Sequence, residues 1–172
     1  MTPAIKVANR QRKKRLDLLA CQTFAEAALA RVSSRNRKIV FPAEIDIFFV
    51  SDTRISQLHR DFLAVGEATD VITFHHGEIF ISVETAERHA EQFSTSFLEE
   101  IELYIVHALL HLAGFEDRTA RGFKRMKAVQ EEIVREVEIA VGLRDKVPGS
   151  RSQQPVVPRL RGTAALQVRN GR

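Results

Sequence analysis

Residues 97–113 read FLEEIELYIVHALLHLA, a stretch with helical periodicity whose second half is almost entirely apolar. Between Leu103 and Ala113 the only polar side chains apart from Tyr104 are His107 and His111. A helix that is apolar nearly all round is buried in the protein interior. We therefore expect a central helix that the rest of the chain covers.

The segments before this helix predict a small β-sheet. Residues 44–50 (EIDIFFV) begin with alternating polar and apolar side chains and are rich in branched and aromatic residues, which indicates a strand. Residues 71–74 and 78–82 predict two short strands joined by a turn at 75–77, and residues 4–8 predict another strand.

Helical patterns surround these strands. Together, strands at the front and helices behind predict an α+β (mixed α/β) fold, with one small, mostly parallel sheet packed with about five helices. The segments with helical periodicity are residues 16–33, 51–62, 83–93, 96–113 and 118–142.

The composition is that of an ordinary globular protein. The 172 residues suit one domain, and no run of about 18 apolar residues predicts a membrane span. Polar residues at helical spacing interrupt residues 16–30, so this segment predicts an amphipathic helix and not a secretion signal. Cys21 is the only cysteine, which fits a small core residue and a cytoplasmic location.

Positive charge is concentrated at the two ends of the chain. Residues 1–15 and 146–172 each hold six Lys or Arg and no acidic residue, while residues 16–145 hold all 22 acidic residues. Prolines and glycines beyond Asp145 predict a domain at residues 1–144 and a basic, disordered tail at 145–172. Basic ends favour a polyanionic partner, although simple solvation of the ends fits the same pattern.

The histidine pair suggests a metal site at the end of the buried helix. His107 and His111 are four residues apart, so they share one helix face. Gly114 suits a left-handed helix stop, and Glu116 and Asp117 follow closely enough for a carboxylate to fold back over the pair. Two imidazoles and one carboxylate are the ligand set of a hydrolytic zinc site.

Simpler interpretations of the same residues stay open. Two histidines at this spacing arise readily by chance, and a buried histidine is often a hydrogen-bonded core residue. Glu116 and Asp117 could be solvated loop acids. His75 and His76 predict a solvated turn, with substrate contact as the alternative. The remaining polar candidates are His59 and His89, expected on helix surfaces, and Asp70, expected as a turn, cap or catalytic residue.

Residues 107–117, HALLHLAGFED, resemble the signature H-G-x-L-H-L-x-G-[FY]-D-H of the YbeY family of rRNA-maturation endoribonucleases. Three upstream blocks resemble that family in the same order, and the resemblance covers roughly residues 5–140. The blocks are LHRDF at 58–62 (family L-N-x-x-[FY]), TDVITF at 69–74 (T-D-V-L-S-F) and GEIFIS at 77–82 (G-D-I-x-I-S).

The resemblance implies a single-strand-specific, metal-dependent endoribonuclease that acts in rRNA maturation and ribosome quality control. It implies one Zn²⁺ per chain, held by His107, His111 and Asp117. Glu116, as a proton shuttle, and Arg60 are the candidate catalytic residues. The expected partner is single-stranded RNA of the ribosome, with no DNA or membrane partner, and the oligomeric state stays open.

Several positions depart from the family pattern. Asp117 stands where the third ligand is usually His, but a carboxylate also binds zinc. Leu63 stands in place of an Arg, for which Arg60, three residues earlier, is the candidate replacement. Ala108 replaces a Gly, which a helix interior readily accepts.

Other function classes remain as alternatives. A metallopeptidase with the motif H-E-x-x-H carries a general base directly after the first histidine, where this chain has Ala108. Two histidines with one carboxylate also suit non-haem iron, although nothing else in the chain indicates oxygen chemistry. Leu63, in place of the family Arg, favours a third hypothesis, a ribosome- or RNA-binding factor with weakened catalysis.

Overall fold

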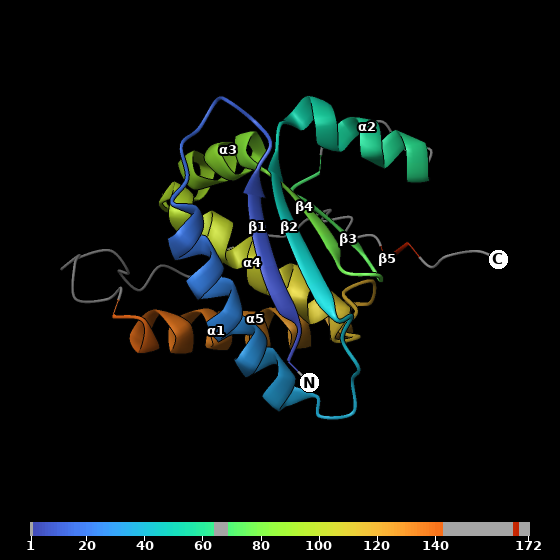
Figure 1. The fold of residues 1–172 in the computed structure, drawn as a ribbon. Coiled ribbons are helices and arrows are strands. Elements are labelled where there is room, and N and C mark those ends of the chain that lie inside the picture. Colours follow the sequence, from blue (N-terminus) through green and yellow to red (C-terminus); the bar gives the residue numbers. More distant parts are fainter. Residues whose placement is uncertain (1, 64–68, 143–166, 169–172) are drawn as a thin grey trace.

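A computed structural model describes residues 2–63, 69–142 and 167–168 of the chain. One sheet and five helices make up the described part (Figure 1). The elements in chain order are β1 (Ala4–Asn9), α1 (Leu18–Arg35), β2 (Glu44–Val50), α2 (Asp52–Leu63), β3 (Val71–Phe74), β4 (Glu78–Ser82), α3 (Val83–Phe93), α4 (Phe97–Leu112), α5 (Ala120–Ala140) and β5 (Gln167–Val168).

The sheet has the strand order β1-β2-β4-β3-β5. β1, β2 and β4 run parallel, β3 pairs antiparallel with β4, and β5 runs parallel to β3. The predicted α+β class and mostly parallel sheet are therefore confirmed. The predicted disordered tail falls largely on residues 143–166 and 169–172, which lie outside the described residues.

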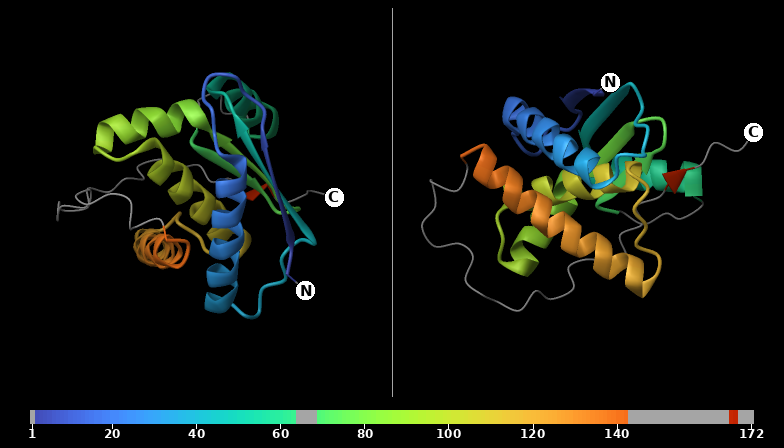
Figure 2. Two further views of the ribbon diagram at one scale, coloured as in Figure 1. Left: turned by 60° about the vertical axis from the view of Figure 1, so that its left-hand side comes forward. Right: turned by 90° about the horizontal axis from the view of Figure 1, so that it is seen from below.

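Alternation along the strands divides the core into two clusters. Ile45, Ile47 and Phe49 of β2 pack in the main cluster, which contains the buried residues of α1, α4 and α5. The intervening Phe48 and Val50 pack in a smaller cluster with residues of α2. The sheet thus separates α2 from the layer of α1, α4 and α5 (Figure 2).

Helix α4 is the central helix of the domain, as the sequence predicts. Every residue from Glu100 to Leu112 is buried, and α4 contacts α1, α3, α5 and β3. Ser96 and Glu99 form a reciprocal capping box, which satisfies free backbone N–H groups at the start of the helix. The cap fixes where α4 begins, and so fixes where its last turn places His107 and His111.

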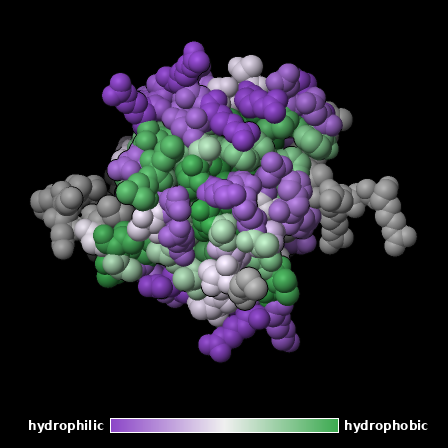
Figure 3. All heavy atoms as spheres, in the orientation of Figure 1, coloured by the Kyte–Doolittle hydropathy of each residue, from purple (hydrophilic) through white to green (hydrophobic). Residues whose placement is uncertain are grey.

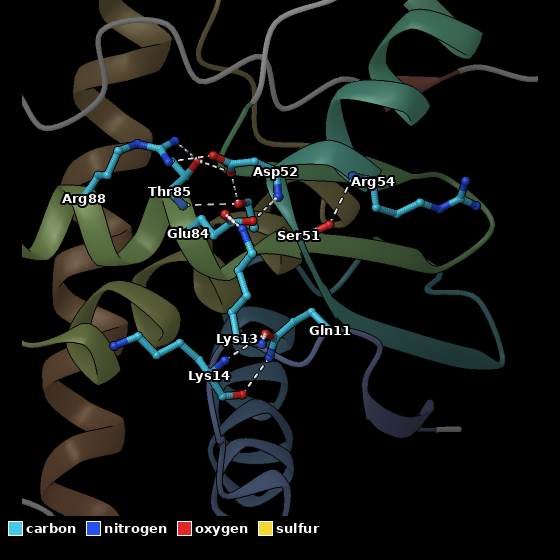
Figure 4. Close-up of polar contacts among 10 residues, drawn as sticks. Gln11, Lys13, Lys14, Ser51, Asp52, Arg54, Glu84, Thr85 and Arg88 are labelled. Atoms are coloured by element: carbon cyan, nitrogen blue, oxygen red, sulfur yellow. Dashed lines mark hydrogen bonds and ion pairs between the residues drawn. The ribbon is translucent and has the colours of Figure 1, made fainter.

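A polar network joins three segments at the carboxyl ends of the parallel strands (Figure 4). Asp52, the first residue of α2, accepts hydrogen bonds from Ser82, from Thr85 at 2.9 Å and from Arg88 at 2.6 Å. Glu84 of α3 accepts from the Asp52 backbone N–H at 2.8 Å and pairs with Lys13. The network connects α2 to α3 and to the segment after β1.

The N-terminal basic segment is part of the folded domain. Besides Lys13, Lys14 pairs with Glu87, and the Arg10 guanidinium lies 3.7 Å from the centre of the Phe48 ring. Hydrophilic side chains gather along the upper edge of the molecule, over this segment and α2 (Figure 3). Among the described residues, no helix is long and apolar enough to cross a membrane.

Candidate metal centre

The two histidines predicted as ligands face each other on the last turns of α4. His107 and His111 are 1% and 3% exposed. Their Nε2 atoms lie 3.0 Å apart, and the ring planes are nearly perpendicular, at 81°. The i, i+4 spacing therefore turns the same ring nitrogen of each histidine toward one point.

The other nitrogen of each ring contacts an oxygen acceptor. His107 Nδ1 lies 3.0 Å from Gln130 Oε1, and His111 Nδ1 lies 3.0 Å from the backbone oxygen of Phe115. Because an oxygen acceptor requires a proton on Nδ1, the neutral ring keeps a lone pair on Nε2. Two lone pairs thus face each other across 3.0 Å, an arrangement that a bound cation stabilises.

Burial favours the neutral, metal-binding form of His111. Burial lowers the pKa of His111 to about 3, with a further contribution from the neighbouring His107. The His111 ring therefore carries no net charge at neutral pH and can donate its Nε2 lone pair to a metal ion.

Gly114 ends α4 in the left-handed conformation that the sequence predicts, with φ of +79°. Its backbone N–H donates to the backbone oxygen of His111 at 2.9 Å, and the Phe115 N–H donates to that of Leu110 at 3.0 Å. This turn points the Phe115 carbonyl at His111 and brings the following residues back over the helix end.

Asp117 completes a three-residue cluster. Its Oδ2 lies 3.8 Å from the Nε2 of both His107 and His111. Zinc bonds to nitrogen and oxygen are about 2.0–2.2 Å long, so ligand atoms of one ion must lie within about 4 Å of one another. The three atoms meet this requirement, and the donor set of two neutral imidazoles and one carboxylate fits a divalent metal ion.

Comparisons with known proteins show the family of this chain. A family model described as "Endoribonuclease YbeY" matches residues 6–138. The chain belongs to the YbeY family. A relative named "Endoribonuclease YbeY" from Chlamydia trachomatis is 31% identical over an alignment of 145 residues, and the match covers 77% of this chain and 86% of that protein. One of the same name from Christiangramia forsetii is 32% identical over an alignment of 108 residues, and the match covers 59% of this chain and 73% of that protein.

A solved structure supports the fold assignment. The solution structure of a protein from Thermotoga maritima superposes with a TM-score of 0.57 and covers 86% of this chain and 99% of its own. The two sequences are 24% identical, so this likeness concerns the fold alone.

The other two residues predicted to act in this YbeY-family chain are exposed. Glu116 is exposed on the loop next to Asp117. Arg60 is exposed on α2, whose buried Ile55 and Leu58 pack on the opposite sheet face from α4. Among contacts between described residues, none joins Arg60 to the histidine pair, and both catalytic roles stay predictions.

The structure also gives the positions of three further polar residues that the sequence analysis considered. His59 is buried at 4% exposure, so its predicted surface position is wrong. His89 is half-buried, with Nδ1 2.6 Å from the Tyr104 hydroxyl. Asp70 is buried, and its carboxylate accepts from the Val71 N–H at 2.8 Å; burial raises the pKa of this carboxyl, and the nearby His107 opposes that rise.

Sequence patterns missed two residues that support the cluster. Gln130 comes from α5, 23 residues after His107, and no local spacing marks it. Gly122 allows the first turn of α5 to pack on the ligand loop, because a Cβ there would lie 2.4 Å from the Glu116 backbone oxygen. The sequence signal for Gly122 is a glycine inside a helical pattern, which often indicates close packing.

Proposed function

We propose that this chain is a metal-dependent endoribonuclease that uses one Zn²⁺ held by His107, His111 and Asp117. We further propose that it cuts single-stranded RNA of the ribosome, in rRNA maturation and ribosome quality control, within the cytoplasm. The observation that carries the proposal is the buried histidine pair with a returning carboxylate, in a chain whose family relatives bear the name endoribonuclease.

Each residue of the cluster has a distinct part in the proposed reaction. His107 and His111 present neutral nitrogen ligands from a rigid helix, and Asp117 adds one negative charge. When bound, Zn²⁺ would supply Lewis-acid polarisation of a phosphoryl oxygen and of water. Glu116, exposed beside the cluster, would exchange a proton with the attacking water at its carboxylate, and Arg60 is a candidate for a phosphate contact.

The test begins with protein purified without added metal. Bound metal is measured, and cleavage is followed on single-stranded ribosomal RNA, on a duplex of the same sequence and on a generic peptide. We expect zinc, cleavage of the single strand alone, and loss of both zinc and cleavage in His107→Ala. The control His75→Ala changes an exposed histidine in a turn and should keep its metal.

The same assay separates the alternatives. Full metal occupancy in His107→Ala would refute the ligand assignment, and RNA cleavage that survives a chelator would indicate a contaminant. Peptide cleavage that His111→Ala abolishes would favour a metallopeptidase, although buried Ala108 occupies the place of its general base. Binding of rRNA without any cleavage would support a factor with weakened catalysis.

We also propose that the basic tail at residues 145–172 adds non-specific affinity for RNA. The tail holds six Lys or Arg, all within 146–172, and each phosphate contact releases counterions. Deleting residues 146–172 should flatten the dependence of RNA affinity on salt concentration, measured by fluorescence anisotropy at several salt concentrations. An unchanged slope would show that the tail does not contact RNA.

A further inference from the structure

Gln130 connects helix α5 to the metal cluster. Its side chain is 2% exposed, and Oε1 accepts a hydrogen bond from His107 Nδ1 at 3.0 Å. Met126, Ile133 and Val134, about one turn away on either side, belong to the main core cluster. A buried amide without a hydrogen-bond partner is destabilising, so the fold retains this contact.

The contact decides which nitrogen of His107 carries the proton. The Nε2 atoms of His107 and His111 lie 3.0 Å apart, a distance that also suits a hydrogen bond between the rings. A proton on His107 Nε2 would be donated to His111 and would occupy both lone pairs that a metal needs. A proton on Nδ1, donated to Gln130, leaves the Nε2 lone pair for the metal.

The two histidines are held in different ways. His111 Nδ1 donates to the backbone oxygen of Phe115, which the turn after α4 fixes independently of side-chain identity. His107 Nδ1 depends on a side chain from another helix. A side-chain substitution at position 130 can therefore change the tautomer of His107, whereas the acceptor for His111 is a backbone atom.

We propose that Gln130 is a positioning residue that holds His107 in its metal-binding tautomer and thereby makes α5 part of the metal centre. This inference rests on the metal site of the proposed function and deepens it. Because a charged acceptor forms the stronger hydrogen bond, a carboxylate at position 130 should hold the Nδ1 proton more firmly than the amide does.

Metal affinity provides the first test, with zinc itself as the probe. Zinc is partitioned between the protein and a chromophoric chelator, for the wild type and for Gln130→Met, Gln130→Glu and Val134→Ala. Gln130→Met keeps the length of the side chain without the acceptor and should bind zinc about 10–100-fold more weakly. Gln130→Glu should bind at least as tightly as the wild type. Val134→Ala, a packing control on the same helix, should keep wild-type affinity.

Proton exchange provides a readout that a loss of packing would not reproduce. In the zinc-loaded protein, the His107 Nδ1–H resonance should exchange slowly with water in the wild type and in Gln130→Glu, and rapidly in Gln130→Met. Equal affinity and equally slow exchange in Gln130→Met would overturn the inference, as would an equal loss of affinity in Val134→Ala.

These outcomes are separate from those for RNA cleavage. A wild-type protein that binds no zinc would overturn both this inference and the proposed metal centre. A wild-type protein that binds zinc while Gln130→Met is unaffected would overturn this inference alone. The expected loss in Gln130→Met would support it whether or not the protein cuts RNA.

Discussion

At the scale of single residues, Asp117 sets the charge of the proposed centre. Its carboxylate is the single anionic group of the three-residue cluster and lies 3.8 Å from both histidine nitrogens. With two neutral imidazoles, it reduces the charge of a divalent ion by one. The acidity of nearby water depends on that net charge.

Asp117→His should therefore keep the metal and change the pH dependence of cleavage. Removing the negative ligand leaves a more positive centre, which makes nearby water more acidic, so the rise of the cleavage rate with pH should move to lower pH. Metal content and a pH–rate profile for single-stranded RNA check this expectation. A profile that moves to higher pH at full metal occupancy would contradict it.

Gly122 governs how closely α5 approaches the ligand loop. In Gly122→Ala, the new Cβ would lie 2.4 Å from the Glu116 backbone oxygen, so backbone must shift at the loop that carries Asp117. Overpacking of this kind costs about 1–3 kcal/mol. We expect a lower free energy of unfolding, measured with urea, together with weaker zinc binding. Arg121→Ala, at an exposed neighbouring position, is the control, and equal behaviour of the two variants would refute the prediction.

The residues whose proximity the sequence predicts correctly are those marked by local spacing. His107, His111, Gly114 and Asp117 lie within eleven consecutive residues, so helix geometry and one turn determine how they meet. Gln130 reaches His107 only because α4 and α5 pack together, and local periodicity carries no information about that contact. The buried position of His59, four residues after buried Ile55, could have been read from helical spacing.

At the scale of elements, the polar network at the start of α2 and α3 connects the two helices through Asp52, whose charge depends on pH. Partial burial opposes the charge of Asp52, but hydrogen bonds from Arg88, Ser82 and Thr85 outweigh burial and hold the pKa of this carboxyl below 3.8. A carboxyl whose pKa is lower in the folded chain stabilises the fold when it is charged.

Asp52→Asn should therefore destabilise the protein at neutral pH and matter less in acid. The stabilisation by Asp52 is complete above its unfolded pKa, near 3.8, and is lost as the pH falls through the lower, folded value. Melting temperatures of wild type and variant between pH 7 and pH 2.5 should converge toward the acidic end. Asp61→Asn, an exposed carboxyl on the same helix, serves as the control. A difference that does not change with pH would refute the role of the charge.

Element boundaries follow the sequence closely because their signals are local. Asp17, Ser82, Ser96 and Thr119 each cap the helix that follows, and each side chain accepts from the backbone three residues on. The order of the strands in the sheet has no such local signal. Local sequence patterns predict β1, β2, β3 and β4 one by one, but only long-range packing places β4 between β2 and β3.

At the scale of the whole molecule, the candidate centre connects α4 and α5, two helices of the main core cluster. The histidines lie on α4, Asp117 lies on the loop between α4 and α5, and Gln130 lies on α5. Because all of these groups must be in their folded positions to bind one ion, metal binding and folding are linked. An ion that binds only the folded state adds to the free energy of unfolding by mass action.

Zinc should therefore raise the melting temperature of the entire domain. At a free zinc concentration of about 100 times the dissociation constant, the added stability is about 2.7 kcal/mol. For a chain of this size, each kcal/mol raises the melting temperature by about 2–4 °C, so we expect a rise of roughly 5–10 °C in scanning calorimetry. His111→Ala should show no such rise, because it lacks a ligand. A rise of equal size in His111→Ala would locate the stabilising ion elsewhere, and no rise in the wild type at saturating zinc would mean that the cluster does not hold the metal in the folded chain.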